Sequence, residues 1–168
     1  MSQLKPRRAF DEGHTRKFLV IADETPEIDA ALYFAACRAQ RTIGKLVFLY
    51  IIQPQDFQHW MGVKDMQVEE ETKKAKAIFR LLRRKLTNGG LDVEAEDVIR
   101  EGNVVEQIYA HIEEDEDIAI LVLGAAVDTK GPGPLISSIA MGKAAGAFPI
   151  PISIVTGHLT LDEVKELA

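Results

Sequence analysis

The stretch DIAILVLGAAVDTKGPGPLISSIA, Asp117 to Ala140, contains the parts from which the whole fold is predicted. It begins with an almost continuously apolar run, which is typical of a strand that is buried on both faces. A connection rich in glycine and proline follows, and Pro134 suits the first position of a helix. We therefore expect a strand, a tight loop and a helix, which together form the building unit of a parallel sheet.

The same alternation runs through the rest of the chain. Apolar runs at Lys17–Asp23 and Lys45–Ile52 predict two further buried strands. Apolar and charged residues alternate in Leu91–Gly102, as they do in an edge strand. The segment Ile150–Gly157 predicts the last strand, which should lie at the other edge of the sheet.

Helical patterns separate these strands. Thr25 predicts an N-cap, followed by Pro26 in the first turn, and Asn103 predicts the cap of a later helix. Between them, Gln67–Leu86 is strongly amphipathic. Its apolar stripe consists of Ala75, Phe79, Leu82 and Leu86, and the spacing of Glu69–Lys73 and Glu70–Lys74 predicts two i,i+4 ion pairs.

Strands joined by helices must run parallel, and right-handed crossovers place the helices on both faces of the sheet. The order of the elements therefore predicts a doubly wound α/β domain with five strands. We expect this domain to span residues 16–158. Residues 1–15 should form a flexible N-terminal arm, and residues 159–168 a short C-terminal helix or tail.

Composition limits the classes of function. The formal net charge of −6 argues against nucleic acid as a partner, because phosphates are neutralised by clustered lysine and arginine. No apolar run reaches the roughly 18 residues of a membrane span. Cys37 is the sole cysteine, which suits a reducing compartment, so we expect a cytoplasmic protein. The four histidines are scattered, and we expect no metal site.

Ligands of doubly wound sheets bind outside the carboxyl ends of the strands. Three places in the chain meet this condition: Asp23–Thr25 after the first strand, Gly102–Asn103 after the third, and the loop before Pro134. These three segments are therefore the candidate binding regions.

The loop before Pro134 has features of an anion site. Gly131 and Gly133 allow a ligand to approach the backbone, and the start of a helix attracts negative charge. Ser137 and Ser138 add hydroxyl donors, and Lys130 adds a positive charge. The alternative is a tight connection that binds nothing, because glycine and proline are also typical of such turns.

Several segments together resemble the universal stress protein family. VIADETPEIDAAL is similar to the family's first strand and helix, VFLYII to its second strand, and REGNVVEQI to its glycine followed by a capped helix. LVLG is similar to the start of the family's nucleotide loop. The resemblance covers Lys17 to Thr156 and implies an adenine nucleotide alpha-hydrolase-like, Rossmann-like sheet with strand order 3-2-1-4-5.

The resemblance also implies site residues. In the family, the pattern G-x2-G-x9-G-[ST] holds the phosphates of ATP, and here its four positions are Gly124, Val127, Ser137 and Ser138. Valine and serine thus replace two glycines at which the backbone would touch phosphate. We expect weak ATP binding, with Mg²⁺ only if ATP is bound, or binding of AMP through its base and ribose. Asp23 would contact the nucleotide, and Ala22 and Ile51 would line the adenine.

Two functions follow from these observations. The first is a stress-response or regulatory protein that binds an adenine nucleotide, and the second is an interaction module of the same fold that binds none. We expect no enzyme, because no nucleophile–base pair is evident. The family resemblance implies a homodimer through Pro151–Thr156, and a further regulatory protein partner is expected. Phe57 and Trp60 in the predicted loop Gln53–Asp65 would form a lid or partner surface, or pack locally over the sheet edge.

Overall fold

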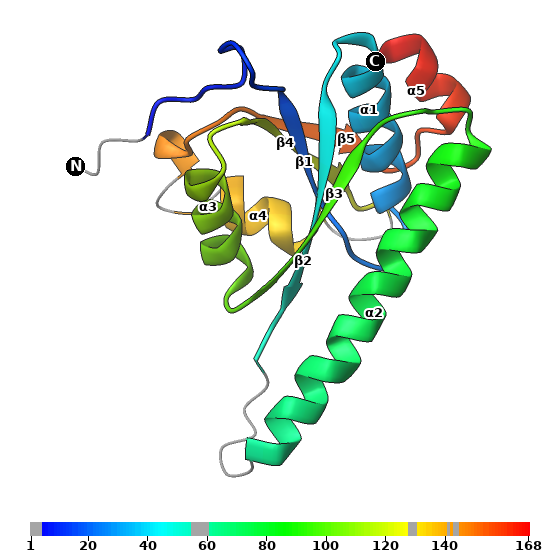
Figure 1. Cartoon of the computed structure of the whole chain (residues 1–168). Helices are drawn as coiled ribbons and strands as arrows, with labels where there is room; N and C mark the ends of the chain where they lie inside the picture. The colour runs from blue at the N-terminus through cyan, green and yellow to red at the C-terminus, as the bar shows by residue number, and fades with distance from the viewer. Residues whose placement is uncertain (1–4, 55–60, 128–130, 141, 143–144) are drawn as a thin grey trace.

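The computed structural model describes residues 5–54, 61–127, 131–140, 142 and 145–168. One sheet of five parallel strands forms the centre of the molecule, in the order β3-β2-β1-β4-β5 (Figure 1). The predicted strand order and the predicted edge positions of the third and fifth strands are therefore confirmed. The strands are β1 (Lys17–Ile21), β2 (Lys45–Ile52), β3 (Ala95–Glu101), β4 (Ile118–Ala125) and β5 (Ile152–Thr156).

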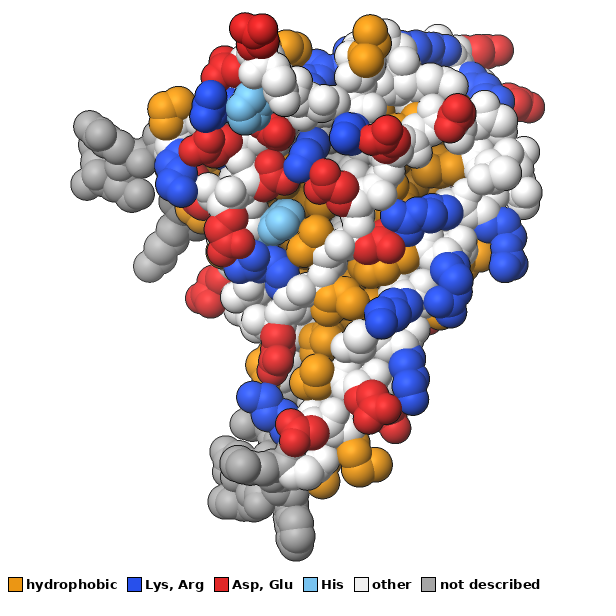
Figure 2. Space-filling model, viewed as in Figure 1, with side chains coloured by type: hydrophobic (Ala, Val, Ile, Leu, Met, Phe, Trp, Pro, Cys, Tyr) orange, Lys and Arg blue, Asp and Glu red, His pale blue; other side chains and the backbone are white. Residues whose placement is uncertain are grey.

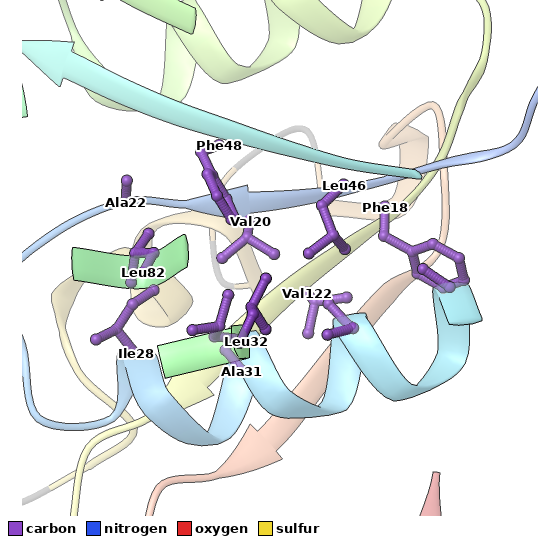
Figure 3. Packing of buried hydrophobic residues seen from close by; sticks show 14 of the residues in the cluster. Phe18, Val20, Ala22, Ile28, Ala31, Leu32, Leu46, Phe48, Leu82 and Val122 are labelled. Carbon is purple, nitrogen blue, oxygen red and sulfur yellow. The ribbon is translucent and has the colours of Figure 1, made fainter. Parts of the chain in front are cut away.

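Helices cover both faces of the sheet, as expected for a doubly wound domain (Figure 1). Alternate residues of β1 enter two separate cores: Phe18 and Val20 face α1 and α2, whereas Leu19 and Ile21 face α3 and α4. Figure 3 shows the first of these cores, between the sheet and α1. The helices are α1 (Ile28–Arg41), α2 (Met61–Asn88), α3 (Val104–Glu114), α4 (Pro134–Ala140) and α5 (Leu161–Leu167), with a short 3-10 helix at Ala145–Ala147.

One of the two predicted helix caps is confirmed and the other is wrong. The Asn103 side chain accepts a hydrogen bond from the Glu106 N–H, so the predicted cap of α3 is confirmed. The predicted cap of α1 at Thr25 is wrong, because the helix begins two residues later than expected and Glu27 occupies its N-cap position. Thr25 instead turns back and donates to the Asp23 carboxylate, which is an Asx turn.

Helix α2 is longer than its sequence pattern indicates. It begins at Met61, so the predicted loop Gln53–Asp65 is wrong for residues 61–65, while Phe57 and Trp60 lie outside the described residues. The predicted stripe of Ala75, Phe79, Leu82 and Leu86 is buried, as expected. Even so, within the described residues no helix combines the length and the apolar character that a membrane crossing requires.

The length of α2 matters because it exceeds the length of the sheet. The helix has 28 residues and β2 has 8. At about 1.5 Å per residue for a helix and about 3.3 Å for a strand, α2 is longer than β2 by roughly 15 Å. Its N-terminal half therefore extends past the carboxyl end of the sheet (Figure 1).

Residues 5–15, which we expected to belong to a loose arm, are hydrogen-bonded to the domain. The Arg7 guanidinium donates to the carbonyl oxygens of Ile112, Asp115 and Ile118 at 2.5–3.2 Å. Ala9 is buried. The described part of the segment thus lies against the end of α3 and the start of β4.

Candidate functional site

A cavity of about 580 Å³ opens at the carboxyl ends of β1 and β2. Two of the three predicted binding regions meet there, since Asp23 follows β1 and Asn103 precedes α3. Ala22, Ile51 and Ser138, which were predicted from the family resemblance, also line it. The other lining residues are Ile21, Glu24, Tyr50, Gln53, Lys74, Val104, Val105, Pro134 and Leu135.

On the side of α2, residues at the end of β2 line the cavity and form hydrogen bonds to the protruding half of that helix. The Tyr50 hydroxyl donates to the Glu71 carboxylate at 2.5 Å, and burial, followed by this hydrogen bond, raises the pKa of Tyr50. The Gln67 amide donates to the Gln53 carbonyl oxygen at 3.3 Å. These two contacts fix α2 beside the cavity.

Lys74 supplies a positive charge to this wall. Its ammonium lies 3.1 Å from the Glu24 carboxylate, which follows β1. The predicted pairing with Glu70 is therefore replaced by a pairing across the fold, whereas the predicted Glu69–Lys73 pair is present at 3.3 Å. Figure 2 shows that blue lysine and arginine side chains gather along α2.

Asp23 lies where the cavity meets the start of α1. Its carboxylate accepts two hydrogen bonds from Thr25, one from the backbone N–H and one from the hydroxyl, at 2.9 and 2.5 Å. Burial raises the pKa of Asp23 and outweighs the lowering by these two hydrogen bonds, and the neighbouring carboxylates Glu27 and Glu24 raise it further. The group is thus held in one orientation, with one oxygen engaged by Thr25.

A second, smaller cavity of about 100 Å³ lies beside the start of α1 and the loop before α4. Gly124 and Gly133 line it, together with the carboxylate residues Asp23 and Glu27. Among its described lining residues there is no lysine or arginine. The two carboxylates among the described lining residues repel a polyphosphate.

Gly124 has a packing role that the sequence did not indicate. A Cβ built on it would collide with the backbone carbonyl of Glu27. The glycine therefore lets β4 approach the start of α1.

Three of the predicted loop residues, Val127, Gly131 and Ser137, line neither cavity. Val127 is 58% exposed, Ser137 is half-buried, and Gly131 has a positive φ of 143°. Gly133, with φ 103°, lies at the start of α4, which has only seven residues. Lys130 lies outside the described residues. The structure thus brings the predicted adenine residues Ala22 and Ile51 together with Asp23 and Ser138 in the large cavity, whereas Gly124 and Gly133 line the smaller one.

Sequence reasoning missed the residues that α2 and the end of β2 contribute, above all Lys74, Tyr50 and Gln53. Lys74 belongs to an amphipathic helix and Tyr50 to an apolar strand, so neither pattern indicated a role in binding. The available signal was length: a helix much longer than its neighbouring strand must project beyond the sheet, and its residues can then line the ligand edge.

The model of the universal stress protein family matches residues 14–148. The chain belongs to this family. The match covers β1 to the residues before β5, which includes both cavities. A search among curated proteins finds no match.

Solved universal stress proteins have the same fold. The chain is similar to UspA from Lactobacillus plantarum at 19% identity and a TM-score of 0.64, covering 83% of this chain and 97% of that one. It is similar to a family member from Burkholderia pseudomallei at 16% identity and a TM-score of 0.60, covering 83% and 94%. An Arabidopsis thaliana family protein with AMP bound has 12% identity, a TM-score of 0.55 and coverage of 84% and 91%.

Proposed function

We propose that this universal stress protein binds an adenine nucleotide weakly at the carboxyl edge of its sheet, mainly through the base and ribose. The observation that carries the proposal is the cavity of about 580 Å³ beside Asp23. Ligand pockets of roughly 300–1,000 Å³ suit small molecules of nucleotide size. Ile21, Ile51 and Val104 offer apolar surface to a base, and polar groups of Gln53 and Asn103 lie on the same lining.

Family members with the same fold support this proposal. One was solved in complex with cAMP, one from Archaeoglobus fulgidus in complex with dAMP, and the Arabidopsis protein with AMP. Each of these ligands carries one phosphate. That agrees with the acidic lining of the smaller cavity, which disfavours a triphosphate.

We infer a regulatory role in stress rather than catalysis, acting through a homodimer and a further protein partner. The edge strand β5 supports the dimer. Ile154 is 50% exposed on it, and among the described strands β5 pairs only with β4. An apolar strand edge is a hazard for aggregation unless another chain covers it. In the interaction-module alternative, the protein acts through this surface and binds no nucleotide.

Calorimetric titration with adenosine, AMP and ATP tests the proposal. Ser138→Trp, on the exposed surface of α4 that lines the cavity, should obstruct it and abolish binding. Ala140→Trp changes an exposed residue of the same helix outside the lining and should leave binding intact. If the wild type binds no adenine compound at millimolar concentration, the interaction-module alternative holds.

A double variant tests whether the loop is a degraded phosphate site. Val127→Gly/Ser137→Gly restores both family glycines, and each regained hydrogen bond to a charged group is worth roughly 1.5–3 kcal/mol. A gain in ATP affinity would identify the loop as such a site. An unchanged ATP affinity would indicate that the acidic lining is what disfavours ATP.

A further inference from the structure

We infer that Lys74 of α2, rather than the loop after β4, receives the phosphate of a nucleoside monophosphate, and that Glu24 holds this lysine while the cavity is empty. The inference rests on the proposed function, because it assigns the anionic part of the same ligand. A residue of α2 would then determine how strongly the site prefers a charged ligand.

Lys74 is suitably placed for this role. Among the described lining residues of the large cavity it is the one lysine or arginine. It also lines a neighbouring groove of about 430 Å³ between the start of α1 and α2. The ammonium therefore stands at the boundary of the two spaces, within reach of a ligand in the cavity.

The helix holds Lys74 in position through residues on the same face. Gln67, Glu71 and Lys74 are spaced at i, i+4 and i+7, so they project toward the same side of α2. The first two are hydrogen-bonded to Gln53 and Tyr50 at the end of β2. Lys74 thus belongs to a fixed row of side chains along the cavity wall.

The pairing with Glu24 is one that a phosphate can replace. The Lys74 and Glu24 side chains are 45% and 64% exposed. Ion pairs between such solvated groups contribute little to stability, so their separation is easily compensated. A phosphate offers the lysine more oxygen acceptors and more charge than the carboxylate does.

The alternative place for the phosphate is unfavourable on three counts. Asp23 lines both cavities, and each has a second carboxylate. Glu24 of the large cavity is paired with Lys74, whereas no described lysine or arginine lines the smaller cavity beside Glu27, and the Glu27 carbonyl oxygen lies against Gly124. Helix α4 has only seven residues. One lysine offsets a larger share of the charge of a monophosphate than of a triphosphate, so the arrangement favours AMP over ATP.

Titration of four proteins with AMP and adenosine tests this inference. For Lys74→Gln we expect AMP affinity to fall about tenfold or more, to the level of adenosine, with adenosine affinity unchanged. Glu24→Gln should raise AMP affinity severalfold by removing the competing carboxylate. Lys73→Gln is the matched control, because Lys73 is 75% exposed, pairs with Glu69 and does not line the cavity.

The outcomes separate the inference from the proposed function. If adenosine and AMP bind but Lys74→Gln weakens neither, or weakens both equally, the inference is wrong and the nucleotide site remains. If neither compound binds the wild type, the proposed function fails and the inference fails with it. A loss confined to AMP, which shrinks at high salt because exposed charges are screened, would support it.

Discussion

Gly124 of β4 lies directly against the backbone of Glu27 at the N-cap of α1. Any side chain at this glycine would overlap the Glu27 carbonyl group. The contact sets how closely the first helix approaches the centre of the sheet. It also explains a glycine that a family motif alone would assign to phosphate binding.

Gly124→Ala should therefore destabilise the fold without a role for any ligand. Forcing a methyl group into a closely packed site costs about 1–3 kcal/mol. We expect a corresponding decrease in the free energy of unfolding, measured by denaturant titration. Gly62→Ala is the control, because nothing lies within 4 Å of its Cβ position in α2, and it should stabilise the helix by roughly 0.5–1 kcal/mol. Equal stability of Gly124→Ala and wild type would refute the packing role.

Arg7→Ala should release the segment before β1. The substitution removes a donor shared by three backbone carbonyl groups, and part-buried acceptors left without partners cost about 1–3 kcal/mol. We expect lower stability and faster proteolysis within residues 5–15. Arg8→Ala removes only a surface ion pair with Asp11 and should change neither measurement. Unchanged proteolysis of Arg7→Ala would show that other contacts hold the segment.

His111 should make stability depend on pH. Burial lowers the pKa of His111, the nearby Arg100 lowers it further, and Lys17 adds a smaller lowering that Asp115 and Glu114 oppose. Neither ring nitrogen has a hydrogen-bond partner among the described residues. The unfolded chain thus binds a proton more readily than the folded one, so the free energy of unfolding should fall as the pH drops below about 6.5.

The variant His111→Leu tests this pH dependence. It removes the titrating group and two unpartnered nitrogens, so we expect a more stable protein whose free energy of unfolding changes less between pH 6.5 and 5. His158→Gln, at an exposed position after β5, should retain the wild-type slope. An identical slope in wild type and His111→Leu would assign the acid sensitivity to other groups.

Ile154→Lys should weaken the proposed homodimer. A lysine on the exposed side of β5 would place a charge in an apolar contact between two chains. Light scattering at micromolar concentration should show a dimer for the wild type and a larger monomer fraction for the variant. Met66→Lys, which alters another exposed apolar side chain on α2, is the control. A wild-type monomer at this concentration would remove the dimer proposal.

The sequence by itself determined the fold, because the local patterns all predict the same arrangement of strands and helices. Apolar runs such as Lys45–Ile52 must be buried on both faces, and helices between them force parallel pairing. The rule that ligands bind at the carboxyl ends of strands then placed Asp23 and Asn103 at one edge, where both line the cavity.

Only the tertiary structure decided which partners these residues meet. Lys74 is spaced for Glu70 on its own helix, yet it pairs with Glu24 from the end of another element. Gly124 matches a phosphate motif, yet the Glu27 backbone lies against it. Local spacing fixes neighbours along one helix or strand, whereas contacts between elements depend on how far each extends and how closely they pack. Those contacts between elements therefore determine which charged groups line the cavities.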